Sequence, residues 1–158
     1  MMSQFLFILL AMTIASAYAQ VNFIGSWKVT DFVENQAPMQ MPQRNNMVLT
    51  LKSDDEVNYH ITMIIGNRFM GGFKVVSTTS DGVATIETGG LAGTRMMPPP
   101  AMQPFEQFMS QMWPAMNEMF VVSDILTIKG PSAKIVCERS GDISGSSWKT
   151  ISRASQWP

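Results

Sequence analysis

The fold is decided between residues 57 and 65, which read Val57-Asn58-Tyr59-His60-Ile61-Thr62-Met63-Ile64-Ile65. Apolar side chains occupy the odd-numbered positions of this stretch, and Asn58, His60 and Thr62 stand between them. Such a two-residue period is typical of a β-strand that buries one face and exposes the other. We therefore expect a sheet with one apolar face, and we expect His60 on the solvated face rather than in a ligand site.

Shorter segments of the same kind lie on both sides of this strand. They are found at residues 26–30, 47–51, 73–76, 83–86, 120–122, 125–128 and 133–138, and residues 148–151 are a candidate edge strand. Turn-forming pairs such as Gly66-Asn67, Gly71-Gly72 and Asp81-Gly82 separate several of them, and a loop rich in Pro, Gln and Asn covers residues 34–46. Parallel strands need long crossover connections, so these short links predict an antiparallel sheet.

One segment has the period of a helix instead. After Pro98-Pro99-Pro100, apolar residues recur at steps of four and three, at Phe105, Met109, Met112, Met116 and Met119. This spacing predicts a helix whose apolar face packs on the sheet. The polar side of this helix is expected to carry Gln103, Glu106, Gln107, Gln111, Asn117 and Glu118. Proline is tolerated in the first turn of a helix, as at Pro104, whereas Pro114 should kink the helix or restart it. The predicted fold class is mainly β with one α segment.

The N-terminus has the features of an export signal. Residues 5–19 form an uncharged, mostly apolar run that ends in Ala17-Tyr18-Ala19, an A-x-A cleavage pattern. The run is shorter than the roughly 20 residues that cross a bilayer. We expect a signal peptide at 1–19, one domain at 20–140 and a Ser/Gly-rich tail at 141–158. An uncleaved membrane anchor is the alternative; cleavage leaves no stable transmembrane anchor and yields a secreted or exported protein, in an extracellular, periplasmic or secretory compartment.

The composition excludes several classes of function. A single cysteine and a single histidine among 158 residues cannot form an intramolecular disulfide or a closed zinc site with four N/S ligands. The formal net charge of −1 lacks the basic excess of a nucleic-acid binder. The sequence also has no phosphate-binding glycine loop, nucleophile elbow or zinc-protease motif. We expect no catalytic residues, no cofactor and no nucleic-acid partner.

Two further groups of residues have structural interpretations. An odd cysteine in an exported protein indicates an intermolecular disulfide or a buried thiol. Cys137 shares one face of its strand with Ala133 and Ile135, which favours the buried thiol. Asp54-Asp55-Glu56 lacks the spaced oxygen ligands of a calcium loop, and we interpret it as a solvated turn.

Three motifs, in this order, resemble the META/HslJ family. The first is Gly25-Ser26-Trp27, which opens the first strand. The second is Ile65-Gly66-Asn67-Arg68-Phe69-Met70-Gly71-Gly72-Phe73, similar to the family's glycine-cysteine-asparagine segment followed by a glycine and an aromatic residue. The third is Thr94-Arg95-Met96-Met97-Pro98, similar to its threonine-arginine-methionine-alanine-cysteine segment. The resemblance covers about residues 23–139. Both cysteines of the family pattern are absent here, consistent with an unpaired Cys137.

The resemblance implies a small, antiparallel, partly open β-barrel with a helix packed across it. It also implies an exported or envelope-associated protein without enzymatic activity, linked in the family to stress resistance, motility or virulence. The matching motif positions are Gly25, Trp27, Gly66, Asn67, Gly71, Thr94, Arg95 and Met96. We interpret Gly66, Gly71 and Gly72 as sites of positive φ or close strand approach. Arg95 either bonds carbonyls or a carboxylate beneath its loop, or binds a ligand.

The methionines suggest where contacts with other molecules lie. The chain has 15 methionines, and four of them, Met39, Met41, Met96 and Met97, fall in proline-flanked loops rather than on a predicted core face. Methionine is common at adaptable binding surfaces, which favours contact with an unknown protein partner. Thioethers also suit the soft ion Cu(I), so copper binding by these four residues is an alternative.

A third possibility is a carrier function. Gly25-Ser26-Trp27 soon after a signal peptide also resembles the lipocalins, closed barrels that carry small apolar ligands. A barrel lined by Met and Phe could hold such a ligand. The order of elements argues against the lipocalins, because the predicted helix precedes the last strands rather than following them.

Overall fold

The computed structural model describes residues 22–141. The predicted signal peptide, most of the predicted tail and the candidate strand at 148–151 lie outside this described part. None of the helices within residues 22–141 has the length and apolar character needed to cross a membrane.

Nine strands and three short helical segments make up the described chain. The strands are β1 (Gly25–Glu34), β2 (Ala37–Pro38), β3 (Val48–Ser53), β4 (Asn58–Ile64), β5 (Arg68–Thr78), β6 (Ala84–Gly93), β7 (Glu118–Val122), β8 (Ile125–Lys129) and β9 (Ala133–Arg139). Between β6 and β7 lie the 3-10 turn η1 (Pro100–Met102), the helix α1 (Gln103–Met112) and the 3-10 turn η2 (Trp113–Ala115).

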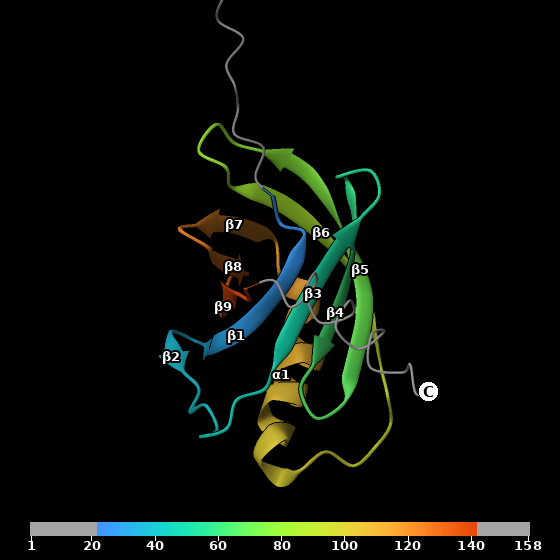
Figure 1. Ribbon diagram of the computed structural model, residues 1–158, viewed down its shortest axis with the longest axis vertical. Coiled ribbons are helices and arrows are strands. Elements are labelled where there is room, and N and C mark those ends of the chain that lie inside the picture. Colours follow the sequence, from blue (N-terminus) through green and yellow to red (C-terminus); the bar gives the residue numbers. More distant parts are fainter. Residues whose placement is uncertain (1–21, 142–158) are drawn as a thin grey trace, which may run out of the picture.

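The strands form a closed, antiparallel barrel with α1 packed at one end (Figure 1). The order around the ring is β1-β3-β4-β5-β6-β7-β8-β9, and β9 pairs back onto β1. The two-residue β2 pairs only with the end of β1 and lies outside the ring. The predicted antiparallel barrel with a helix across it is therefore confirmed, and the ring is closed rather than partly open.

The pairing between β6 and β7 is much shorter than the other pairings of the ring. It consists of Ala84 with Met119 and Thr85 with Glu118. Beyond this point β6 continues to Gly93 while the chain on the other side forms η2 and α1. The helix therefore lies beside the part of β6 that pairs with β5 on one side but has no strand on its other side.

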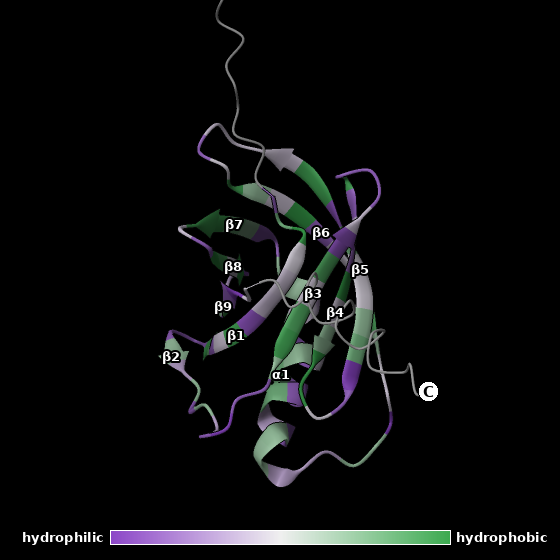
Figure 2. Cartoon of the chain, viewed as in Figure 1, coloured by the Kyte–Doolittle hydropathy of each residue, from purple (hydrophilic) through white to green (hydrophobic). Residues whose placement is uncertain are grey.

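Alternating side chains of the strands fill the barrel interior. Tyr59, Ile61 and Met63 of β4 are buried while His60 is exposed, as the alternation predicts. In Figure 2 green hydrophobic segments stand out on β3, β4 and β7, whereas turns such as that between β3 and β4 are hydrophilic. Phe105 and Phe108 of α1 pack on Phe32 with ring centroids 5.2 and 5.0 Å apart. The helix thus completes the core at one end.

The predicted helix was too long. The helix α1 ends at Met112 because Pro114 cannot continue it, and the chain forms η2 instead. Met116 caps η2 and Met119 belongs to β7, although both are buried as the apolar stripe predicted. Glu118, expected on the polar side of the helix, pairs across β7 and β8 with Lys129 at 2.9 Å.

The glycine pair Gly71-Gly72 was predicted as a turn, but it lies inside β5, which starts at Arg68. A Cβ at position 71 would lie 2.6 Å from the Gly90 carbonyl oxygen. Close strand approach therefore explains Gly71, whereas positive φ does not, since only Gly25 and Gly82 have it among the glycines of residues 22–141. The register of β5 and β6 shifts beside this contact, between Gly71 and Phe73.

The first motif joins the start of β1 to the end of β9, where Trp27 pairs with Arg139. Trp27 is fully buried and donates its indole N–H to the Phe23 carbonyl at 3.0 Å. The Arg139 guanidinium lies 4.1 Å from the centre of the Trp27 ring and forms a 2.9 Å ion pair with Asp124. Gly25 has a φ of +136° at this contact, a value that favours glycine.

Cys137 lies on the inner face of β9 and is fully buried. Burial raises the pKa of its thiol to about 12. The predicted buried thiol is confirmed, and no other described cysteine exists with which it could pair.

Candidate functional site

A polar cluster joins the β4–β5 turn, the loop after β6 and the first turn of α1. Its centre is Asn67, which is 3% exposed. The Asn67 side-chain amide donates to the Met96 carbonyl at 2.8 Å and to Glu106 Oε2 at 2.9 Å. Its side-chain oxygen accepts from Thr94 Oγ1 at 2.9 Å and from the Met96 N–H at 3.1 Å. All hydrogen-bonding positions of this side chain are therefore used.

Glu106 supplies the charge of this cluster. Its Oε1 accepts the Asn67 backbone N–H at 2.6 Å, while Oε2 accepts the Asn67 side-chain amide. Glu106 belongs to the first turn of α1, where the helix dipole favours a negative charge. One carboxylate thus ties the start of the helix to the turn that precedes β5.

Gly66 is required by the same contact. A Cβ at this position would lie 2.8 Å from Glu106 Oε1, 3.0 Å from Pro98 Cβ and 3.2 Å from Pro99 Cδ. Such distances are shorter than normal contacts, so any side chain would displace the Glu106 carboxylate or the proline segment. The structure therefore brings together the motif residues Gly66, Asn67, Thr94 and Met96 through Glu106, which sequence reasoning placed only on the polar side of a helix.

The cluster holds a loop whose apolar side chains point to solvent. We call residues 94–99 the Met96-Met97 loop. Asn67 bonds both the N–H and the C=O of Met96, yet the Met96 side chain is 66% exposed and that of Met97 is 93% exposed. Pro99 has φ −52° and ψ 142°, an extended polyproline conformation. The result is a constrained backbone with exposed thioethers.

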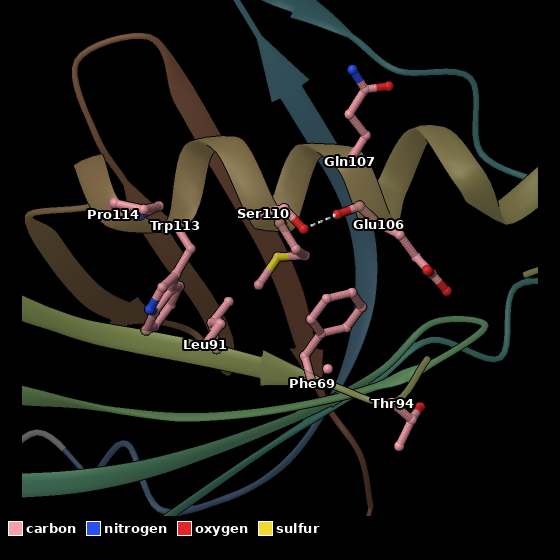
Figure 3. A pocket seen from close by; sticks show the side chains of 10 residues that line it. Phe69, Leu91, Thr94, Glu106, Gln107, Ser110, Trp113 and Pro114 are labelled. Atoms are coloured by element: carbon pink, nitrogen blue, oxygen red, sulfur yellow. Dashed lines mark hydrogen bonds between the residues drawn. The ribbon is translucent and has the colours of Figure 1, made fainter. Parts of the chain in front are cut away.

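An open cleft of about 510 Å³ lies next to the cluster, between the end of β6 and α1. Its lining residues are Phe69, Leu91, Gly93, Thr94, Glu106, Gln107, Met109, Ser110, Trp113 and Pro114. Figure 3 shows Leu91 and Trp113 close together at one end and Thr94 at the other, while Gln107 points away from the strands. The volume is in the range of ligand-binding clefts.

The polar groups of the cleft are largely occupied by bonds within the protein. The Trp113 indole donates to the Gly89 carbonyl at 3.0 Å, and Ser110 donates to the Glu106 carbonyl at 3.0 Å. Among residues 22–141, Glu106 is the single charged residue that lines the cleft, and both of its oxygens accept bonds from Asn67. The cleft is thus a mixed surface, slightly more apolar than polar, whose one charged side chain is already hydrogen-bonded.

The remaining candidate residues have different surroundings. Met39 and Met41 are partly buried and pack against the core, unlike the exposed Met96 and Met97. Arg95 is exposed and forms no hydrogen bond or ion pair with residues 22–141. No group of three or more His, Cys, Asp or Glu side chains in the described range is arranged to hold a metal ion.

The acidic turn between β3 and β4 is held by its own hydrogen bonds. Asp55 accepts the N–H groups of Val57 at 3.0 Å and Asn58 at 2.7 Å, together with the Asn58 side-chain amide at 2.8 Å. Bonds from the backbone N–H and side chain of Asn58, and then from Val57, lower the pKa of Asp55 to about 2. These bonds assign the carboxylate to the turn, as the sequence predicted.

A protein-family model matches the whole described part of the chain. The model of the META domain matches residues 21–141, which is the whole described barrel. The chain belongs to the META domain family. The resemblance seen in the three motifs is thereby confirmed, and the predicted domain at 20–140 differs from the matched range by one residue at each end.

Comparison with solved structures shows a similar fold in another protein. An NMR structure of a protein from Burkholderia xenovorans is similar, with a TM-score of 0.55 and 19% identity over 75% of this chain and 83% of the other. No curated protein sequence matches the chain significantly. The function of this META domain must therefore be argued from its own surface.

Proposed function

We propose that this META domain is an exported, non-catalytic binding domain that contacts another protein through the Met96-Met97 loop. The observation that carries the proposal is the contrast within this loop. Asn67 fixes the Met96 backbone at both its N–H and its C=O, while the two methionine side chains remain 66% and 93% exposed. An ordered backbone lowers the entropy lost on binding, and flexible thioethers adapt to a partner's surface.

The polar cluster supports this interpretation. Five hydrogen bonds around Asn67 maintain a loop that adds nothing to the buried core at Met96 and Met97. Exposed apolar side chains gain free energy when a partner covers them. The export part of the proposal rests on the A-x-A pattern after the apolar N-terminal run.

The carrier alternative receives less support. The interior of the barrel is occupied by large core side chains, including Trp27, Phe32, Met63, Met109 and Trp113. The copper alternative needs four methionines in one environment, whereas Met39 and Met41 pack on the core and the other pair is exposed.

Site-specific crosslinking tests the proposed contact surface. A photoreactive phenylalanine analogue is placed at Met97, and in a matched control at Val76 of β5, which is 51% exposed. Both proteins are made in the cells that produce the chain and are irradiated. We expect a discrete protein adduct from position 97 that is absent from position 76. Equal labelling from both positions, or none from 97, contradicts the proposed surface.

Export is tested separately on the unchanged protein. Cell fractionation followed by N-terminal sequencing should yield a chain that begins at Gln20 outside the cytoplasm. A full-length chain retained in the cytoplasm contradicts export without affecting the proposed contact surface.

A further inference from the structure

We infer that the free edge of β6 at residues 91–93 binds an extended segment of a protein partner as an added β-strand. The inference goes beyond the Met96-Met97 loop, since it concerns a different surface and a different kind of contact. It rests on the proposed function only in that the ligand is a protein.

The direction of the backbone groups follows from the pairing of β5. Val75 donates its N–H to the Val57 carbonyl, so Val75 faces β4 and not β6. Backbone groups of successive residues in a strand alternate between its two neighbours. Phe69 and Gly71 therefore also face β4, and their partners in β6, Gly93 and Leu91, have no bonds across to β5.

The other side of β6 confirms this alternation. The Thr94 N–H donates to the Arg68 carbonyl in β5, so Thr94 and Ala92 face β5. The Ile86 N–H donates to the Asn117 carbonyl, away from β5, because the register shift between Gly71 and Phe73 adds one residue to β6 and reverses the alternation. Met70 and Ala92, the pair between Gly71–Leu91 and Phe69–Gly93, therefore form the hydrogen bonds between β5 and β6 at this point. The N–H and C=O groups of Leu91 and Gly93 point to the free edge, and no residue from 22 to 141 bonds them there.

The cleft gives this edge room, and apolar side chains are among its lining residues. Leu91 and Gly93 themselves line the 510 Å³ cleft, and Met109 of α1 also lines it. Trp113 and Pro114 bond the Gly89 carbonyl and the Thr88 hydroxyl, which closes the edge beyond residue 91 to strand addition. An added strand would thus run beside residues 91–93 toward the Met96-Met97 loop.

The chemistry of the cleft selects an extended peptide over other ligands. Two donors and two acceptors, on residues separated by about 6.6 Å along a strand, match the spacing of another extended backbone. The absence of a free charge among the lining residues disfavours a phosphate, a nucleotide or a metal ion. Side chains of the added strand that point into the cleft are expected to be apolar.

Amide exchange measured by NMR on the unchanged protein provides the first test. In the free protein we expect the Leu91 and Gly93 amides to exchange at least 10-fold faster than the Ala92 amide between them. Random 12-residue peptides displayed on phage are then selected against the protein, and the best binder is synthesised. On binding, the Leu91 and Gly93 amides should slow more than 10-fold while Ala92 changes little.

Backbone chemistry distinguishes strand addition from simple apolar contact. N-methylation of alternate amides in the peptide should abolish binding in one register and leave it within about threefold in the other. In the protein, Leu91→Pro removes the edge donor and should abolish binding. The control Leu91→Ala removes the side chain, keeps the N–H and should retain measurable binding. Thermal unfolding verifies that both variants fold, and proline is tolerated on a strand edge.

Several outcomes overturn the inference. They are a selection that yields no binder, peptides that leave the exchange of Leu91 and Gly93 unchanged, and binding that is insensitive to N-methylation. Displacement of the peptide by dodecanoate, with protection absent from both amides, assigns the cleft to small apolar ligands instead. None of these results bears on crosslinking from Met97, so this inference and the proposed loop contact can fail independently.

Discussion

Replacing Asn67 by alanine should destabilise the domain more than replacing the exposed Asn58 by alanine. The substitution removes four hydrogen bonds of a side chain that is 3% exposed. Three of these bonds join neutral groups and contribute about 1 kcal/mol each, while the bond to the Glu106 carboxylate contributes about 2 kcal/mol. The gross loss is therefore about 5 kcal/mol.

Water reduces this loss. Thr94 and Met96 are exposed, so solvent reaches the groups that Asn67 leaves behind, and Glu106 keeps its bond from the backbone of residue 67. We expect a net loss of about 3 kcal/mol in the free energy of unfolding. For a domain of this size that corresponds to a fall in Tm of about 12 °C.

Urea and thermal unfolding followed by circular dichroism measure this effect. Asn58→Ala is the matched control, because Asn58 also uses its side-chain amide, in a 2.8 Å bond to Asp55, but at an exposed site. We expect the control to lose less than about 1 kcal/mol. In Asn67→Ala the Met96 amide should also exchange faster. A loss no larger than that of the control would refute the central role of Asn67.

The remaining predictions concern three single positions. Gly66→Ala should cost about 1–3 kcal/mol of stability in urea unfolding, because its Cβ would lie 2.8 Å from Glu106 Oε1, whereas Gly90→Ala, with no atom within 4 Å, should cost much less. The pKa of Asp55 is lowered from 3.8 to about 2, so its carboxylate stabilises the fold above pH 3.8 and this contribution is lost as the pH falls toward 2. Unfolding curves of Asp55→Asn should show a smaller change between pH 4 and pH 2, and an equal change contradicts the assignment. The pKa of Cys137 is raised to about 12, so Ellman's reagent at pH 8 should react with it only after unfolding in urea, and rapid reaction of the folded protein contradicts its burial.

Much of the barrel follows from the sequence because burial of one face imposes a two-residue period on each strand. Tyr59, Ile61 and Met63 show this in β4, where the alternation and the burial agree. The same reasoning failed after Pro114, because Met116 and Met119 keep helical spacing although they are buried from a 3-10 cap and a strand. Spacing detects burial, and the proline was the better guide to where the helix ends.

The site was predicted only in part, for a reason that lies in distance along the chain. Asn67 and Thr94 were identified through family motifs, but Glu106 lies 39 residues from Asn67 and has no motif of its own. Its position on the polar side of the helix did not indicate that Glu106 would contact Asn67. The free edge of β6 was also missed, since the short β6–β7 pairing depends on where α1 sits in three dimensions.

The position of the polar cluster explains why the barrel can keep an unpaired strand edge at all. Free edges promote aggregation, and proteins restrict access to them. Here Glu106 ties α1 to the β4–β5 turn, so the helix remains beside residues 91–93 and limits the edge to a cleft. The same bonds hold the Met96-Met97 loop where β6 ends. Loss of Asn67 should therefore loosen both surfaces together, whereas Leu91→Pro should affect only the edge. Comparing peptide binding and crosslinking in these two variants separates a shared scaffold from two independent contacts.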